Sequence, residues 1–283
     1  MPRAGLPLYF YEGRTIRGTG LIVWALLIEL VTVVFAGLTL AALALMLGPA
    51  LQSPGGVVPS ALTAVVAVCG ISLGQVVMAV LFLVGFRHVY AGRHEYGLDQ
   101  AQSLERALVF LMVYLVLTIV SYLYTVTSNF LEPGLAGLPA VDLLSGNLVL
   151  APIGATFAGL ALLYTARALA EETQRRRLVT AWVLGIAGAT AGPLLLAFAV
   201  SAALNDLDSI VSGLLASAVA GQGLSALSLL LFALAFHDIR RNLEAGRPAP
   251  VLPRIEQAYP WMYRPPYPYP PPPAAGPPPP PKP

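Results

Sequence analysis

Charged side chains are scarce in this chain, and their scarcity argues against a soluble protein. Only 11% of the 283 residues are charged and 57% are hydrophobic, whereas soluble domains carry about 25% charged residues. So few charges cannot keep a whole surface in water, so we expect the lipid bilayer to surround most of the chain. The net charge of +2 is too small to favour nucleic acid as a partner.

Residues that build metal and redox sites are also rare. The single cysteine, Cys69, cannot form an internal disulfide, and we expect it to be a small buried hydrophobe. The three histidines lie at the ends of apolar runs or in loops, which excludes paired-histidine haem ligation inside a bundle. The loop around His94 and Glu95 matches no standard metal spacing, and its arginines would oppose a cation. We therefore expect no metal and no cofactor.

Several enzyme signatures are missing. The sequence contains no HExxH, no Walker A loop and no GxGxxG pattern, each of which carries a specific chemistry. No pair of acids within an apolar run suggests an aspartyl protease. We therefore expect a protein without enzymatic activity.

What the sequence does contain is six long apolar runs. A helix needs about 20 apolar residues to cross the hydrocarbon core, and these runs are apolar all round, which favours helices over a membrane barrel. The first run is longer than the roughly 7–15 residues of a signal-peptide core, so we expect it to be retained. The sequence predicts an all-α, polytopic six-transmembrane-helix bundle, with spans at about 19–47, 59–87, 105–126, 146–169, 178–203 and 210–236.

Basic residues fall on one side of these six spans. All 16 lysines and arginines lie in the N-terminal segment 1–18, near the connections after the second and fourth runs, or in the C-terminal segment. The positive-inside rule then predicts a multi-pass plasma-membrane protein with both termini cytosolic. In the connection "EETQRRR", Arg175, Arg176 and Arg177 either bind anionic lipid phosphates of the inner leaflet or only set the topology.

The composition changes at residue 247. We expect a cytosolic segment 1–18, a transmembrane domain 19–246 and a proline-rich tail 247–283. Proline cannot continue a helix, so the tail should be disordered and extended, in the manner of polyproline II. Its stretch "YPWMYRPPYPYPPPP" interleaves aromatic residues with proline, as segments that dock into aromatic-lined grooves do. The tail is therefore either a spacer or a site for protein partners.

Small residues repeat at four-residue spacing in several runs. In lipid, helices pack through small side chains that let backbones approach closely. We expect the closest packing between the fifth and sixth spans, and we expect Pro193 to kink the fifth span as a static bend or a hinge. The predicted packing positions are Gly70, Gly74, Gly188, Gly192, Gly213, Ser217, Gly221 and Ser225.

One carboxylate, Glu29, lies inside the first run, in "WALLIELVTVVF". Acids within a membrane are costly and indicate function by default. Its helical neighbours are small or hydroxylated, so we expect Glu29 to face the bundle interior, and without a cation at its depth desolvation favours the neutral acid. Counting inward from each helix end predicts a midplane polar layer of Glu29, Gln75, Tyr114, Thr156 and Thr190.

Three interpretations of Glu29 remain open. A protonated carboxyl can donate a hydrogen bond to Gln75 or to a backbone carbonyl and so fix helix register. It can serve as a proton or cation site in a transport path, or it can contact another subunit. The function expected from the whole sequence is a non-enzymatic scaffold or accessory subunit of a membrane assembly; the alternative is a small-solute or ion transporter that uses the polar layer.

The layout also resembles a known family. The six-span plan, the loop "GFRHVYAGRHEYGLDQA" after the second span, the short charged turn after the fourth and the proline-rich extension look similar to an uncharacterised family of archaeal multi-span membrane proteins. The resemblance implies a six-helix membrane fold. Because the family has no known activity, the resemblance transfers no catalytic residues.

Overall fold

The computed structural model describes residues 13–52, 57–131, 139–202, 212–213 and 215–249. Within these residues six helical segments are long and apolar enough to cross a membrane, and the sixth, Leu215–Glu244, contains a π-helical turn. The predicted all-α fold with six candidate spans is thus confirmed, while the tail beyond residue 249 lies outside the described residues. The elements are α1 (Arg14–Gln52), α2 (Val57–Ala91), α3 (Leu98–Leu131), α4 (Pro139–Arg167), α5 (Glu172–Ala202), η1 (Ala218–Gln222) and α7 (Gly223–Glu244).

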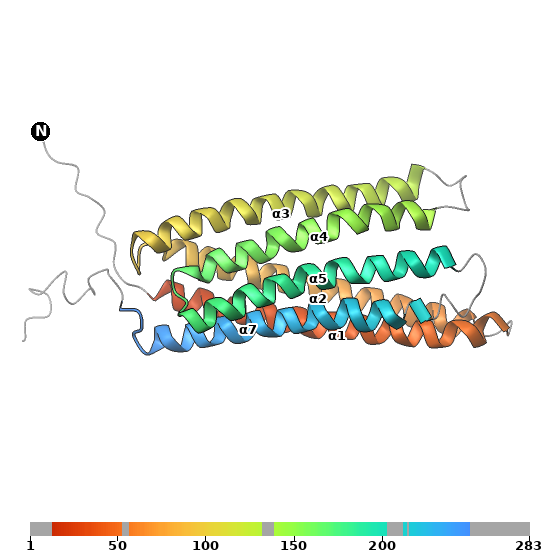
Figure 1. The fold of residues 1–283 in the computed structure, drawn as a ribbon, viewed down its shortest axis with the longest axis horizontal. Helices are drawn as coiled ribbons and strands as arrows, with labels where there is room; N and C mark the ends of the chain where they lie inside the picture. The colour runs from red at the N-terminus through yellow and green to blue at the C-terminus, as the bar shows by residue number, and fades with distance from the viewer. Residues whose placement is uncertain (1–12, 53–56, 132–138, 203–211, 214, 250–283) are drawn as a thin grey trace, which may run out of the picture.

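Consecutive helices run in opposite directions and pack as three hairpins (Figure 1). The hairpins are α1 with α2, α3 with α4, and α5 with η1 and α7. Contacts between α1 and α7 and between α4 and α5 join them, so the main contacts follow the series α2–α1–α7–α5–α4–α3. The starts of α1, α3 and α5 and the ends of α2, α4 and α7 lie together, at what we call the charged end.

At the charged end, several helices extend beyond the predicted apolar spans. The helix α3 begins at Leu98, α5 begins at Glu172 and α7 ends at Glu244. These extra turns are amphipathic: they carry charges outside but bury Leu104 and Ile239. A search for continuous apolar runs does not detect such turns, because their charged face breaks the run. The connections at this end are correspondingly shorter than the sequence suggested.

Apolar side chains cover the outside of the bundle. Val31 is 69% exposed, Leu73 is 67% exposed and Val219 is 73% exposed, and water disfavours so much exposed apolar area. This surface indicates contact with a lipid bilayer. Cys69, which we expected to be buried, is also exposed on α2, because a residue that faces lipid needs no cover from protein.

Close helix contact is clearest where α5 meets η1 and α7. A Cβ added to Gly221 would lie 2.6 Å from the Cα of Gly192, and one added to Gly188 would lie 2.9 Å from the carbonyl oxygen of Gly221. The Ser217 hydroxyl donates a hydrogen bond to the carbonyl of Gly192 at 2.9 Å. Added side-chain atoms at Gly188 would also meet Ser225. These residues therefore bring two helix backbones into direct contact.

The other predicted packing positions are in different surroundings. Gly74 of α2 faces the side chain of Thr32 in α1, whereas Gly70 is exposed and only approaches Phe35. Gly213 is helical and partly buried. The helix α5 continues unbroken through Pro193, so the kink expected there remains a prediction.

Candidate functional site

Glu29 lines a cavity of about 210 Å³ inside the bundle. Residues of α1, α2, α3, α4 and α7 form its walls. Their side chains are apolar apart from the carboxyl of Glu29 and the hydroxyl of Tyr114. The helices α2 and α3 are the two ends of the helix series, and side chains of both line this cavity. The expectation that Glu29 faces inward agrees with this position.

The Glu29 carboxyl is not satisfied by the protein. Its Oε2 atom is buried and has no hydrogen-bond partner among the groups that the structure describes. The hydrogen bond to Gln75 or to a backbone carbonyl, one of the three interpretations, is not seen among the described residues. Burying a polar group without a partner costs free energy, so this carboxyl lowers the stability of the folded protein.

The cavity contains only two of the five residues predicted to form a polar layer. Tyr114 lies in its wall with Glu29, but Gln75 is exposed on α2. The hydroxyl of Thr156 donates to its own helix at the carbonyl of Pro152, 2.8 Å away, and that of Thr190 donates to Ile186 at 2.7 Å. Counting residues from a helix end gives the depth of a side chain in the membrane but not the direction in which it points. The count therefore cannot distinguish a residue that lines the cavity from one that is exposed on the outside of the bundle or bonds to its own helix.

A second buried acid, Glu95, caps a helix. It is 2% exposed, and its two oxygens accept hydrogen bonds from the backbone amides of Arg14, at 3.0 Å, and Thr15, at 3.1 Å. The Thr15 hydroxyl donates to the carbonyl of Gly92, and Gln100 donates to that hydroxyl, both at 3.3 Å. Glu95 thus satisfies amides that the first turn of α1 leaves unpaired and places negative charge at a helix N-terminus.

This network has no signal in the sequence, since the cap joins residues about 80 positions apart and leaves no local motif. The residue types of the loop around Glu95 suggest only a metal site. Among the described residues, no group of three or more metal-binding side chains comes together. The role visible in the structure for Glu95 is to join the 92–97 loop to α1.

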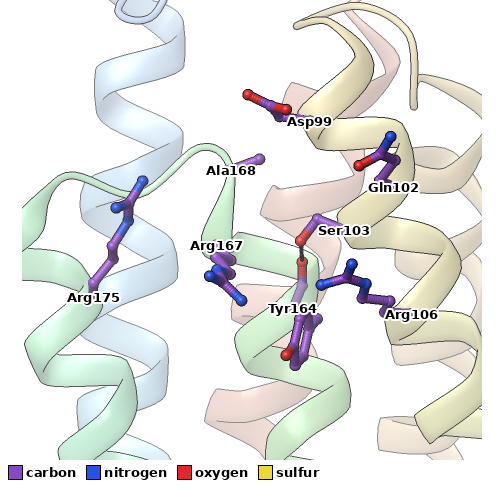
Figure 2. A pocket seen from close by; sticks show the side chains of 8 residues that line it. All are labelled: Asp99, Gln102, Ser103, Arg106, Tyr164, Arg167, Ala168 and Arg175. Carbon is purple, nitrogen blue, oxygen red and sulfur yellow. Dashed lines mark hydrogen bonds between the residues drawn. The ribbon is translucent and has the colours of Figure 1, made fainter.

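At the charged end, a polar pocket of about 300 Å³ lies between the starts of α3 and α5 and the end of α4. Arg106, Arg167 and Arg175 reach it from three different helices (Figure 2). Of the three consecutive arginines considered for lipid binding, only Arg175 lines this pocket. Arg176 pairs with Glu172 at 3.1 Å, and Arg177 pairs with a carboxylate of α7 at 2.6 Å.

One short match to a catalytic pattern was missed in the sequence. Residues 70–74 read GISLG, which fits the GxSxG pattern of a nucleophile elbow. That elbow needs a sharp turn between a strand and a helix, whereas Ser72 is an exposed residue in the interior of α2. The match therefore gives no support for a catalytic serine.

These features define a class: a multi-pass helical membrane protein with an unpaired acid in its interior and an arginine-lined pocket at one end. No family model, curated protein or solved structure matches the chain. The comparisons therefore give no support to the resemblance to an archaeal membrane protein family, and function must be argued from the two sites.

Proposed function

We propose that the chain is a non-enzymatic scaffold or accessory subunit of a membrane assembly. Its charged end would face the cytosol with both termini, contact anionic lipid through arginines, and present the proline-rich tail to protein partners. The observation that carries this proposal is the concentration of polar contacts at the charged end. Elsewhere, the described hydroxyls of Thr156 and Thr190 bond to their own helices, as expected in a packed bundle.

Co-purification tests this proposal. The full chain and a chain lacking residues 250–283 are purified in mild detergent at equal expression, and co-purifying chains are identified. We expect defined partners with the full chain and their loss on deletion. A third variant replaces the tail's tyrosines and tryptophan by alanine but keeps its prolines and length, and it should also lose them. Purification of the full chain alone would contradict a tail-docked scaffold.

A second candidate function is transport of a small solute or ion. It is favoured by Glu29, whose buried Oε2 has no described partner in a cavity wall, since intramembrane acids commonly mark proton or cation paths. The test is flux in proteoliposomes, followed for protons with an enclosed pH-sensitive dye, for the native chain and Glu29→Gln. Transport predicts a flux that the substitution abolishes. If flux and thermal stability were both unchanged, Glu29 would have neither a transport role nor a structural one.

A further inference from the structure

We propose that the pocket formed by Arg106, Arg167 and Arg175 binds the phosphate group of an anionic lipid. We call it the arginine pocket. This proposal rests on the proposed contact of the charged end with anionic lipid. It goes further by naming the binding site and the chemical group that the site binds. It differs from a general attraction of basic residues to the membrane surface, because it assigns binding to particular side chains.

Two of the pocket arginines carry a charge that no described carboxylate balances. Within the described part of the chain, the guanidinium groups of Arg106 and Arg175 form neither an ion pair nor a hydrogen bond. Three other arginines at the same end do pair with carboxylates: Arg176, Arg177 and Arg240, the last with Glu244 at 2.8 Å. Among the described residues that line the pocket, Asp99 is the only acid, so three guanidinium groups face one carboxylate. An anionic group would balance this excess and accept paired N–H donors.

Several side chains that line the pocket are already held in place by neighbouring groups. The hydroxyl of Ser103 in α3 donates to the carbonyl of Tyr164 in α4 at 2.5 Å and joins the two helices. The Tyr164 ring lies 5.3 Å from that of Phe110, and Arg167 is held over Tyr164 with its guanidinium carbon 5.4 Å from the ring centroid. Figure 2 shows Arg106 and Arg167 on either side of Tyr164. A ligand entering here meets side chains that are already partly ordered, which lowers the cost of binding.

The pocket lies where membrane spans begin and end. Arg167 ends one candidate membrane span and Arg175 lies in the first turn of another, while Arg106 lies within a third that begins at Leu98. The charged residues of α3 end at Arg106, and its continuous apolar run begins with the next residue. Arginines at the ends of spans lie at the level of lipid headgroups and extend their guanidinium groups to the interface. The phosphate that reaches this pocket is therefore one carried by a lipid, in preference to a free anion.

The test measures binding by the purified full chain in neutral detergent. Dioctanoyl phosphatidic acid, inorganic phosphate and neutral dioctanoyl phosphatidylcholine are titrated separately, and the shift in thermal unfolding is followed by tryptophan fluorescence. The test variant is Arg106→Gln with Arg175→Gln. The matched control is Arg176→Gln with Arg241→Gln, which removes the same charge from the same end but outside the pocket.

We expect phosphatidic acid to stabilise the native chain, and its affinity to fall about tenfold for each pocket arginine removed, which is about 1.4 kcal/mol each. The control should lose less than about threefold. If the test variant folds poorly without lipid, Arg106→Lys with Arg175→Lys replaces it and should still lose affinity, because lysine lacks the planar fork that grips phosphate.

Three results would overturn the proposal. Equal losses in test and control variants would leave only a general basic surface, in which case the proposed lipid contact survives without this pocket. An equal response to inorganic phosphate would make the ligand a soluble anion. No response of the native chain to phosphatidic acid would remove the site, whereas the scaffold function would still be judged separately by co-purification.

Discussion

Two acids, the partly buried Glu29 and the buried Glu95, differ in what their surroundings make of a carboxylate. Glu95 accepts two backbone amides at the start of α1, and such charge-assisted bonds contribute about 1.5–3 kcal/mol each. The Oε2 of Glu29 has no described partner. The first acid therefore stabilises the fold and the second costs stability. Neither effect can be read from the sequence alone, because it depends on which helix supplies the neighbouring groups.

Replacing Glu95 should destabilise the protein. In Glu95→Ala the amides of Arg14 and Thr15 lose their acceptor, and we expect a loss of about 2 kcal/mol, as for other lost helix caps. The measurement is thermal unfolding in detergent followed by circular dichroism. The matched control is Glu105→Ala, which removes an exposed acid at the same end and should change stability little. Equal stability of both variants would show that the cap contributes nothing.

Replacing Glu29 by leucine should have the opposite effect. Glu29→Leu removes an unsatisfied polar group from an apolar cavity, so we expect unfolding to occur at higher temperature, by the equivalent of about 1–2 kcal/mol. Glu105→Leu is the control, because it makes the same change at an exposed acid of the charged end. A lower unfolding temperature for Glu29→Leu alone would mean that the carboxyl makes a stabilising bond in the membrane.

At the scale of helices, the contact of α5 with η1 and α7 depends on glycine. In Gly221→Ala the new methyl group would lie 2.6 Å from the Cα of Gly192, and only backbone movement can relieve that contact. We expect destabilisation of about 1–3 kcal/mol, as for other overpacked positions. Thermal unfolding measures it.

Gly223→Ala provides the control for this prediction. It lies two residues away on the same helical segment, and apart from its own helical turn no described atom lies within 4 Å of its added Cβ. Alanine favours helix over glycine by about 1 kcal/mol, so this variant should be neutral or slightly stabilised. If the two substitutions had the same effect, stability would reflect helix propensity and not the contact between helices.

The elements differ in how far the sequence predicts them. The six apolar runs are enough to predict the membrane-spanning helices, because only a continuous apolar helix is stable across the hydrocarbon core. The four-residue spacing from Ser217 to Ser225 places small residues on one face, and these residues lie at the contact with α5. The π-helical turn η1 has no comparable sequence signal. It lies beside Gly192, next to Pro193, which lacks an amide hydrogen and leaves a carbonyl of α5 without its usual partner.

For the whole molecule, the order of helices in space was not predictable from the chain. Short connections imply that consecutive helices are neighbours, but they do not determine how hairpins join. In the structure α1 packs on α7 and α5 packs on α4. This order brings together the walls of the Glu29 cavity, and the contact of α4 with α5 brings Arg167 and Arg175 to one pocket. Charge, hydropathy and spacing therefore identify candidate residues, whereas the helix order decides which of them meet.

The orientation of the molecule gives the last prediction. The ends of the described chain lie together at the charged end (Figure 1), and basic residues strongly favour the cytosolic side. In a Cys69→Ser background, single cysteines replace Arg241, at the charged end, and Asp208, in a connection that the sequence assigns to the opposite face. A membrane-impermeant maleimide added to intact cells should label position 208 at least about tenfold more than position 241. After the membrane is made permeable, both should react, which shows that position 241 is accessible. Labelling of position 241 but not position 208 in intact cells would reverse the orientation and place the arginine pocket and the tail outside the cytosol.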